Sequence, residues 1–171
     1  MRAHVRIAAG SDRRDAFTRR FFLLHALFVA SLWENPLWAY EGSARATRIG
    51  PVRSVLEYEV AIRAAGLRNR FAVVDVGADW CEFCAILDDR ILADPRVEEL
   101  LNKFAFVRVD VTSMNKEARE LLSHLSVDGP PTLFIVETDS AREYVNSRSV
   151  GPFDVEDLAR RLRRVAQGGV D

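Results

Sequence analysis

The sequence predicts an α/β fold in which a central mixed β-sheet is flanked by helices. Short runs of β-branched and aromatic residues alternate with segments whose apolar residues recur at helical spacing. These segments are ordered as a strand-helix-strand unit followed by two strands and a helix. The first unit implies parallel strands and the second an antiparallel hairpin, so one sheet contains both kinds of pairing.

The pattern first predicts a helix over residues 55–67, where apolar residues recur at helical spacing. Residues 71–76 form an almost continuous apolar run, which indicates a central strand covered on both faces. Residues 80–92 are typical of a helix, and Asp94-Pro95 restarts one, because Asp caps a first turn and Pro suits its first position. We expect one bent helix or two abutting helices, followed by a second buried strand over residues 104–111.

The remaining elements are a helix, a hairpin and a last helix. Apolar residues between 118 and 125 share one helical face. Residues 132–137 predict a strand, and residues 143–150 predict a second strand that returns antiparallel after a polar turn at 139–140. Asp154 is placed to cap the last helix, which carries an apolar stripe.

Composition predicts one soluble domain with an appendage. The chain has 171 residues, of which 49% are hydrophobic and 29% charged, as in globular proteins. The net charge of -1 gives no general attraction to nucleic acid, and we expect no nucleic-acid partner and a monomer. Six of the 24 basic residues but only three of the 25 acidic residues lie in the first 39 positions, so the positive charge is concentrated there.

Residues 1–39 are typical of an export signal. Arg19-Arg20 precede an apolar run from Phe21 to Trp33, which is shorter than the roughly 20 residues of a membrane-spanning helix. The order Thr, Arg, Arg, Phe, Phe, Leu resembles a twin-arginine signal. The segment is either removed by cleavage after Ala39 or kept as an uncleaved N-terminal anchor. We therefore expect a functional domain over residues 40–171 that works in the periplasm or another extracytoplasmic space.

The two cysteines of the chain, Cys81 and Cys84, lie three positions apart where a buried strand gives way to a helix. The first sulfur of such a pair lies at the helix N-terminus, where free N-H groups and the helix dipole stabilise a thiolate. The second sulfur, one turn on, can close a disulfide with the first and release a partner. Instead of a redox-active pair, the two cysteines could be half of a zinc site or a static disulfide. No further cysteine exists to complete a zinc site, so we expect no metal and no cofactor.

Several motifs in fixed order resemble the thioredoxin superfamily, and most closely the C-terminal periplasmic domain of DsbD-type thiol:disulfide interchange proteins. The resemblance extends from about residue 47 to residue 165. It is carried by the segments Asp75-Val76-Gly77-Ala78-Asp79-Trp80-Cys81, Asp94-Pro95, Val109-Asp110-Val111-Thr112 and Gly129-Pro130-Pro131-Thr132. It implies a thioredoxin-like fold and thiol-disulfide exchange with protein clients.

The resemblance also implies roles for single residues. Asp75 matches a buried acid that exchanges a proton with the second cysteine, Asp88 matches a second carboxylate, and Pro131 matches a cis-proline that faces the disulfide. An unpaired carboxylate in an apolar strand is costly, so Asp75 is also expected from physical reasoning to be protonated near neutral pH. Substrate contacts are expected from Trp80, Glu82, Phe83, Pro130 and Pro131.

Two positions depart from the family pattern. Ala85 stands where a basic residue commonly follows the second cysteine. Pro130 precedes the expected cis-proline and has no N-H, so it cannot donate the backbone hydrogen bond that this position normally offers to a client.

The direction of electron flow depends on what stabilises the Cys81 thiolate. Glu82 places an anion between the cysteines, and together with Asp75 and Asp88 it disfavours the thiolate and favours the disulfide. We therefore expect a reductase, which needs a membrane electron donor of the DsbD/CcdA type. Two other functions remain open. The domain could be an oxidase or isomerase of the same fold, or a non-catalytic binding module with a structural disulfide.

Overall fold

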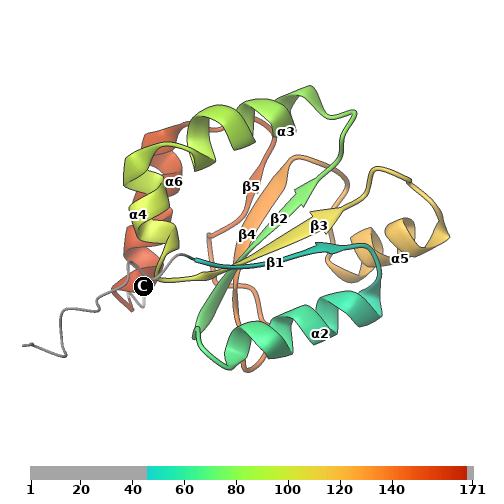
Figure 1. Cartoon of the computed structure of the whole chain (residues 1–171), viewed down its shortest axis with the longest axis horizontal. Helices are drawn as coiled ribbons and strands as arrows, with labels where there is room; N and C mark the ends of the chain where they lie inside the picture. The colour runs from blue at the N-terminus through green and yellow to red at the C-terminus, as the bar shows by residue number, and fades with distance from the viewer. Residues whose placement is uncertain (1–45, 169–171) are drawn as a thin grey trace, which may run out of the picture. The chain divides into compact units, whose positions relative to one another are not determined.

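A computed structural model of the chain describes residues 46–168 (Figure 1). The expected export signal or anchor at residues 1–39 lies outside the described residues, so the division of the chain after residue 39 stays a prediction. Within residues 46–168 no helix is long and apolar enough to span a bilayer.

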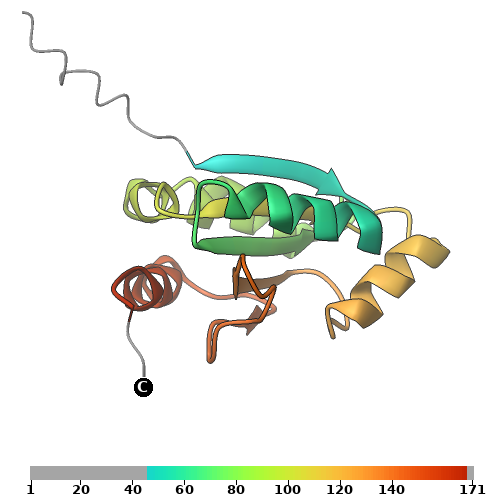
Figure 2. The ribbon, with the colours of Figure 1, turned by 90° about the horizontal axis from the view of Figure 1, so that it is seen from below.

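The core of the structure is a five-stranded mixed sheet with the strand order β1-β3-β2-β4-β5. Both β1 and β2 pair with β3 in parallel, whereas β4 pairs antiparallel with β2 and β5. The strands are β1 Thr47–Val52, β2 Phe71–Gly77, β3 Ala105–Asp110, β4 Thr132–Glu137 and β5 Ser149–Val150. Figure 2 shows β1 at one edge of the sheet, with the segment that leads through β5 into α6 at the opposite edge. The predicted mixed sheet with a central second strand is confirmed.

Helices cover both faces of this sheet (Figures 1 and 2). They are α2 Val55–Gly66, α3 Glu82–Ile86, the π-helical segment η1 Leu87–Leu92, α4 Pro95–Leu101, α5 Lys116–His124 and α6 Val155–Ala166. One apolar cluster joins α2 and α5 to the sheet, and a second joins η1, α4 and α6 to its other face. The helices predicted from apolar spacing are therefore confirmed.

All seven residues of β2 are buried, and their side chains alternate between the two clusters. Ala72, Val74 and Val76 pack under α2 and α5, while Phe71 and Val73 pack under η1, α4 and α6. Asp75 continues the second row, which makes it the polar side chain of an otherwise apolar strand. The fold thus places a carboxyl group in the interior, directly below the helix that follows β2.

The sequence analysis missed β1. This edge strand is mostly exposed or half-buried, so it lacks the apolar run that marks the inner strands. It also contains Gly50 and Pro51, which argue against a strand in most contexts. Gly50 adopts a φ of 133°, and a Cβ atom there would lie 2.6 Å from the carbonyl oxygen of Arg108, so a side chain is excluded at this bend.

The predicted strand over residues 143–150 is wrong for most of its length. Only Ser149–Val150 pair with β4, apart from one isolated bridge between Glu143 and Val136. The buried hydroxyl of Ser147 replaces the missing strand pairing: it accepts a hydrogen bond from the amide of Ile135 at 3.0 Å and donates one to its carbonyl at 3.3 Å. The Ser147 side chain therefore forms the hydrogen bonds with the backbone of Ile135 that a neighbouring strand would otherwise have formed.

Substitution of Ser147 by alanine is expected to lower the free energy of unfolding by about 1–3 kcal/mol, because the buried amide of Ile135 loses its partner. Denaturant unfolding measures this change. Ser140→Ala is the matched control on the same connection, since Ser140 is exposed and its loss is expected to change stability by less than about 0.5 kcal/mol. Equal effects of the two substitutions would contradict the structural role of Ser147.

Candidate active site

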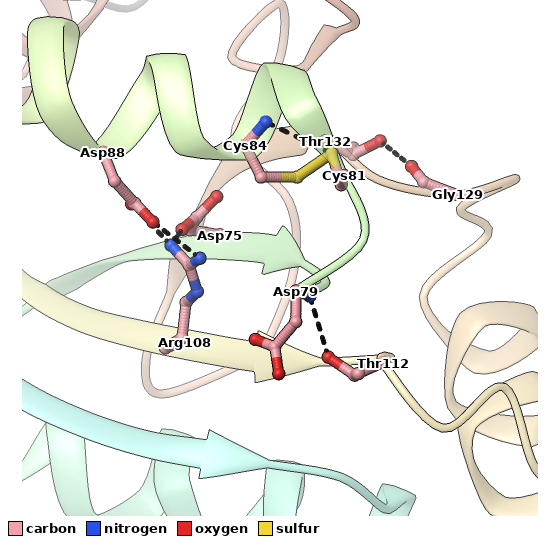
Figure 3. The surroundings of a disulfide bond; sticks show 9 residues. All are labelled: Asp75, Asp79, Cys81, Cys84, Asp88, Arg108, Thr112, Gly129 and Thr132. Carbon is pink, nitrogen blue, oxygen red and sulfur yellow. Dashed lines mark hydrogen bonds and ion pairs between the residues drawn. A yellow bond between two sulfur atoms is a disulfide. The ribbon is translucent and has the colours of Figure 1, made fainter.

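The two cysteines lie at the first turn of α3, just beyond the end of β2 (Figure 3). Cys81 is the N-cap residue of α3, and it forms a disulfide with Cys84, with 5.2 Å between the two Cα atoms. The Sγ atom of Cys81 also accepts a hydrogen bond from the amide of Cys84 at 3.2 Å. When Cys81 is reduced, this amide and the helix dipole favour its thiolate.

The two sulfur-bearing residues differ in their access to solvent. Cys81 is 8% exposed and Cys84 is 3% exposed in the disulfide form. Both residues are buried, and Cys81 is the more accessible of the two to an external thiol or disulfide.

Thr112, at the end of β3, holds the loop that leads to Cys81. Its hydroxyl accepts a hydrogen bond from the amide of Asp79 at 3.0 Å, and its carbonyl accepts one from Nε1 of Trp80 at 3.0 Å. Sequence reasoning gave Thr112 no role, although it belongs to a motif that carries the family resemblance. The two residues before Cys81 are thus held in place by Thr112, which follows the last residue of β3 by two positions.

Asp75 lies on β2 below α3, with 1% of its surface exposed. In the parallel pairing of β2 with β3 it stands opposite Arg108, whose guanidinium Nη1 donates a hydrogen bond to Oδ2 of Asp75. Burial raises the pKa of Asp75 from 3.8 to about 6, and Arg108 opposes that rise. The sequence predicted an unpaired carboxyl group with a raised pKa; the pKa is raised, but the carboxyl group is paired with Arg108.

Asp88 lies on η1 and is brought to the same arginine. Nη1 and Nη2 of Arg108 donate to the two carboxylate oxygens of Asp88 at 2.7 and 2.9 Å. The Asp88 side chain is 42% exposed, so this carboxylate faces both Arg108 and solvent. Sequence reasoning missed Arg108, because a single arginine in a buried strand has no motif; the signal available was its place on the strand next to Asp75.

Two of the expected substrate contacts, Phe83 and Pro131, line a small apolar groove of about 20 Å³. Trp80 and Phe83 are about half exposed, with exposed fractions of 56% and 51%. Pro131 is buried, and the peptide bond between Pro130 and Pro131 is cis. The groove is lined by Phe83, Ile86, Leu87, Ile91, Pro131, Gly151, Pro152 and Phe153.

Glu82 and Pro130 complete the expected set. Glu82 is exposed in the first turn of α3, and Pro130 is half-buried before β4. The structure thus brings the cysteines, Asp75, Asp88 and the two prolines to one end of the sheet. Among residues 46–168 no group of three His, Cys, Asp or Glu side chains is placed to hold a metal ion.

Comparison with known proteins identifies the fold of this arrangement. The sequence model of a family described as thioredoxin-like matches residues 54–138. The chain contains a thioredoxin-like domain. Both the predicted fold class and the predicted superfamily are confirmed.

Named relatives agree with this assignment. A thiol:disulfide interchange protein DsbD of Pseudomonas fluorescens is 32% identical over 136 residues, which is 76% of this chain and 23% of that protein. The DsbD of Ralstonia nicotianae is 32% identical over 121 residues, or 71% of this chain and 20% of that protein. The chain therefore spans less than a quarter of the length of these relatives.

Solved structures share the fold. The oxidised C-terminal domain of Neisseria meningitidis DsbD has a TM-score of 0.59 at 22% identity, and the match covers 67% of this chain and 98% of that one. A thioredoxin from Thermus thermophilus has a TM-score of 0.54 at 24% identity, covering 73% of this chain and 91% of that one.

Replacing Asp75 by asparagine is expected to raise the free energy of unfolding at pH 7 by about 1–3 kcal/mol. With its pKa raised in the folded state, Asp75 binds a proton more tightly there than in the unfolded chain. The favourable contribution of protonated Asp75 to the free energy of unfolding is therefore complete below about pH 4, and it is lost as the pH rises through about 6. The gain from Asp75→Asn should accordingly vanish below about pH 4.

Unfolding curves of the two proteins between pH 3.5 and 8 measure this difference. Asp89→Asn is the control, because Asp89 is an exposed carboxylate on η1 and the same charge is removed at the surface. A loss of stability in Asp75→Asn at pH 7 would show that the ion pair with Arg108 outweighs the cost of burial.

Proposed function

We propose that the chain is an exported thiol-disulfide oxidoreductase that reduces disulfides of protein clients by dithiol/disulfide exchange. The observation that carries this proposal is the Cys81-Cys84 pair at the first turn of α3, with the buried Asp75 beneath it. The names of the relatives, thiol:disulfide interchange proteins, support the same chemistry.

The exchange proceeds in two steps. The Cys81 thiolate attacks one sulfur of a client disulfide, which forms a mixed disulfide and releases the other client sulfur as a thiolate. Cys84 then gives its proton to a nearby base and attacks the sulfur of Cys81. The Cys81-Cys84 bond forms, and the client leaves as its second thiolate, so the client gains two electrons that the protein loses.

Client chains are proposed to bind along the apolar groove beside the disulfide. Exposed Trp80 and Phe83 offer aromatic surface, and Pro131 forms part of the groove floor next to Phe83. Pro130 offers a carbonyl but no N-H, so an extended client makes one backbone hydrogen bond fewer at this position. We therefore propose that apolar side chains of the client contribute more to binding than its backbone does.

Reduction is proposed over oxidation because anions surround the reactive sulfur. Glu82 is exposed in the first turn of α3, next to Cys81, and Asp75 and Asp88 lie below. Negative charge near Cys81 disfavours its thiolate and so favours transfer of electrons to a client.

The electrons are proposed to come from a membrane donor of the DsbD/CcdA type in the periplasm. Two observations support this: the relatives are DsbD proteins, and residues 18–33 resemble an export signal. In this proposal the domain acts as a monomer that alternates between its donor and its clients.

Substitution of Cys84 by serine is expected to trap client proteins as mixed disulfides on Cys81, because the second step cannot occur. Non-reducing electrophoresis after incubation with a disulfide-bonded substrate such as insulin measures the trapped adduct. Cys81→Ser is the matched control and should trap none. A Cys84→Ser protein without adducts would favour a structural disulfide in a binding module.

The equilibrium reduction potential of residues 40–171 is expected to lie nearer to about -270 mV, as in thioredoxin, than to about -120 mV, as in the oxidant DsbA. Titration against glutathione with Trp80 fluorescence measures it. Glu82→Gln should raise the potential by about 20–40 mV, because one nearby anion is worth at most about 1–2 kcal/mol. Glu99→Gln, an exposed change on α4, should leave it unchanged. A wild-type value near -120 mV would indicate an oxidase.

A further inference from the structure

A chain of hydrogen bonds at the end of β3 connects the start of α2 with Trp80. Asp110 is the last residue of β3 and pairs with Gly77 of β2. Its Oδ1 accepts a hydrogen bond from the amide of Thr112 at 2.9 Å, and its Oδ2 accepts one from Nε of Arg53 at 2.8 Å. One carboxylate therefore joins the segment after β3 to the segment between β1 and α2.

The acceptor of the Trp80 indole is a backbone carbonyl, so its position depends on the path of the chain. Nε1 of Trp80 donates to the carbonyl of Thr112 at 3.0 Å. The hydroxyl of Thr112 accepts from the amide of Asp79 at 3.0 Å, and Figure 3 shows these two residues beyond the ends of β2 and β3. Whatever fixes the backbone at Thr112 thus also fixes where the indole lies.

Asp110 fixes that backbone through a turn formed with its own side chain. The amide of Val111 still bonds to the carbonyl of Gly77 at 3.0 Å, as in the sheet. The next amide, that of Thr112, lies beyond the strand and donates to Oδ1 of Asp110 instead. A carboxylate that accepts from the amide two residues on directs the chain into a turn. This turn brings the Thr112 carbonyl to the loop that precedes Cys81.

Arg53 holds the Asp110 carboxylate in the orientation that the turn needs. The backbone at Arg53 is itself fixed by the first turn of α2, because its amide donates to Oε2 of Glu57 at 2.6 Å. The Asp110 side chain is 20% exposed. Burial would raise the pKa of Asp110, but hydrogen bonds from Thr112 and the charge of Arg53 lower it below its ordinary value. The carboxylate is thus ionised at neutral pH and able to accept from both partners.

We propose that Asp110 is a positioning residue for client recognition, because it fixes the backbone that holds the Trp80 indole in place. Arg53 orients Asp110 in this role. The inference rests on the proposed function, in which the half-exposed Trp80 contacts the client. An aromatic side chain that is already fixed loses less conformational entropy when a partner binds to it. The hydrogen bonds of Asp110 go to Thr112 and Arg53, so its loss acts on client binding through Trp80 and not on the sulfur atoms.

The test compares two substrates of the reduced full chain. Insulin offers a protein disulfide with neighbouring side chains, whereas the disulfide of mercaptoethanol offers no side chain for Trp80 to contact. The ratio of the two second-order rate constants is measured for wild type, Asp110→Ala, Asp110→Asn and Arg53→Met. Arg63→Met is the matched control, because the Arg63 side chain is 65% exposed, against 60% for Arg53, and its ion pair with Glu59 lies within α2.

The indole N-H resonance of Trp80 gives an independent reading of the same hydrogen bond. The full chain contains three tryptophans, so a Trp80→Phe protein assigns this signal in a nitrogen-proton correlation NMR spectrum. Loss of the hydrogen bond to Thr112 should shift the resonance and speed its exchange with water. A variant that is folded but merely less stable would leave the resonance at its wild-type position.

We expect Asp110→Ala to lower the ratio by about threefold to tenfold and to shift the Trp80 resonance. Arg53→Met should change both in the same direction by less, since the Asp110 carboxylate remains and only its orientation is freed. Asp110→Asn should stay nearer to wild type than Asp110→Ala, because its side-chain oxygen can still accept from the amide of Thr112. Arg63→Met should leave the ratio and the resonance unchanged.

An unchanged ratio in Asp110→Ala and Arg53→Met would overturn the proposal, whether or not the resonance moves. An Asp110→Asn protein as impaired as Asp110→Ala would overturn it too, since the turn would then not be the cause. If Asp110→Ala does not fold, Arg53→Met decides, because Arg53 is largely exposed and its ion pair contributes little to stability. A wild-type chain that reduces neither disulfide would instead contradict the proposed function.

Discussion

The arrangement of this domain depends on one constraint, which is a carboxyl group placed in the apolar centre of the sheet. Asp75 interrupts a strand whose other residues are apolar or glycine, and burial alone would keep it protonated. Arg108 on the neighbouring strand offsets that cost only in part, so the pKa of the carboxyl group stays raised, at about 6. A carboxyl group with such a raised pKa can exchange protons nearer to neutral pH than an ordinary one.

This constraint extends to the residues around the pair. A Cβ atom at Gly77 would lie 2.8 Å from Nη2 of Arg108, so a side chain there would displace the guanidinium. Asp88 lies on the helical segment above the same strand end, where it accepts hydrogen bonds from Nη1 and Nη2 of the guanidinium. The carboxylate that binds Arg108 from the surface and the disulfide at the start of α3 are therefore fixed by one continuous helical stretch from Glu82 to Leu92.

Much of the fold was predictable because single residues carry strong local information. The apolar run of β2, the Asp94-Pro95 start of α4 and the Asp94 side chain that accepts from the amide of Arg96 follow from the sequence alone. By contrast, β1 and the Ser147 contact depend on which segments meet in space. The pairing of Arg108 with Asp75 is of the same kind, because strand register is set by tertiary packing.

The helical stretch above β2 also separates two cavities, one on each side of it. Phe83, Leu87 and Ile91 line the apolar groove together with Pro131. Asp88, Leu92 and Arg108 line a separate cavity of about 500 Å³, and the two cavities share no lining residue. In the proposed exchange, a client that covers the groove leaves the second cavity, and with it Arg108 and Asp88, open to water.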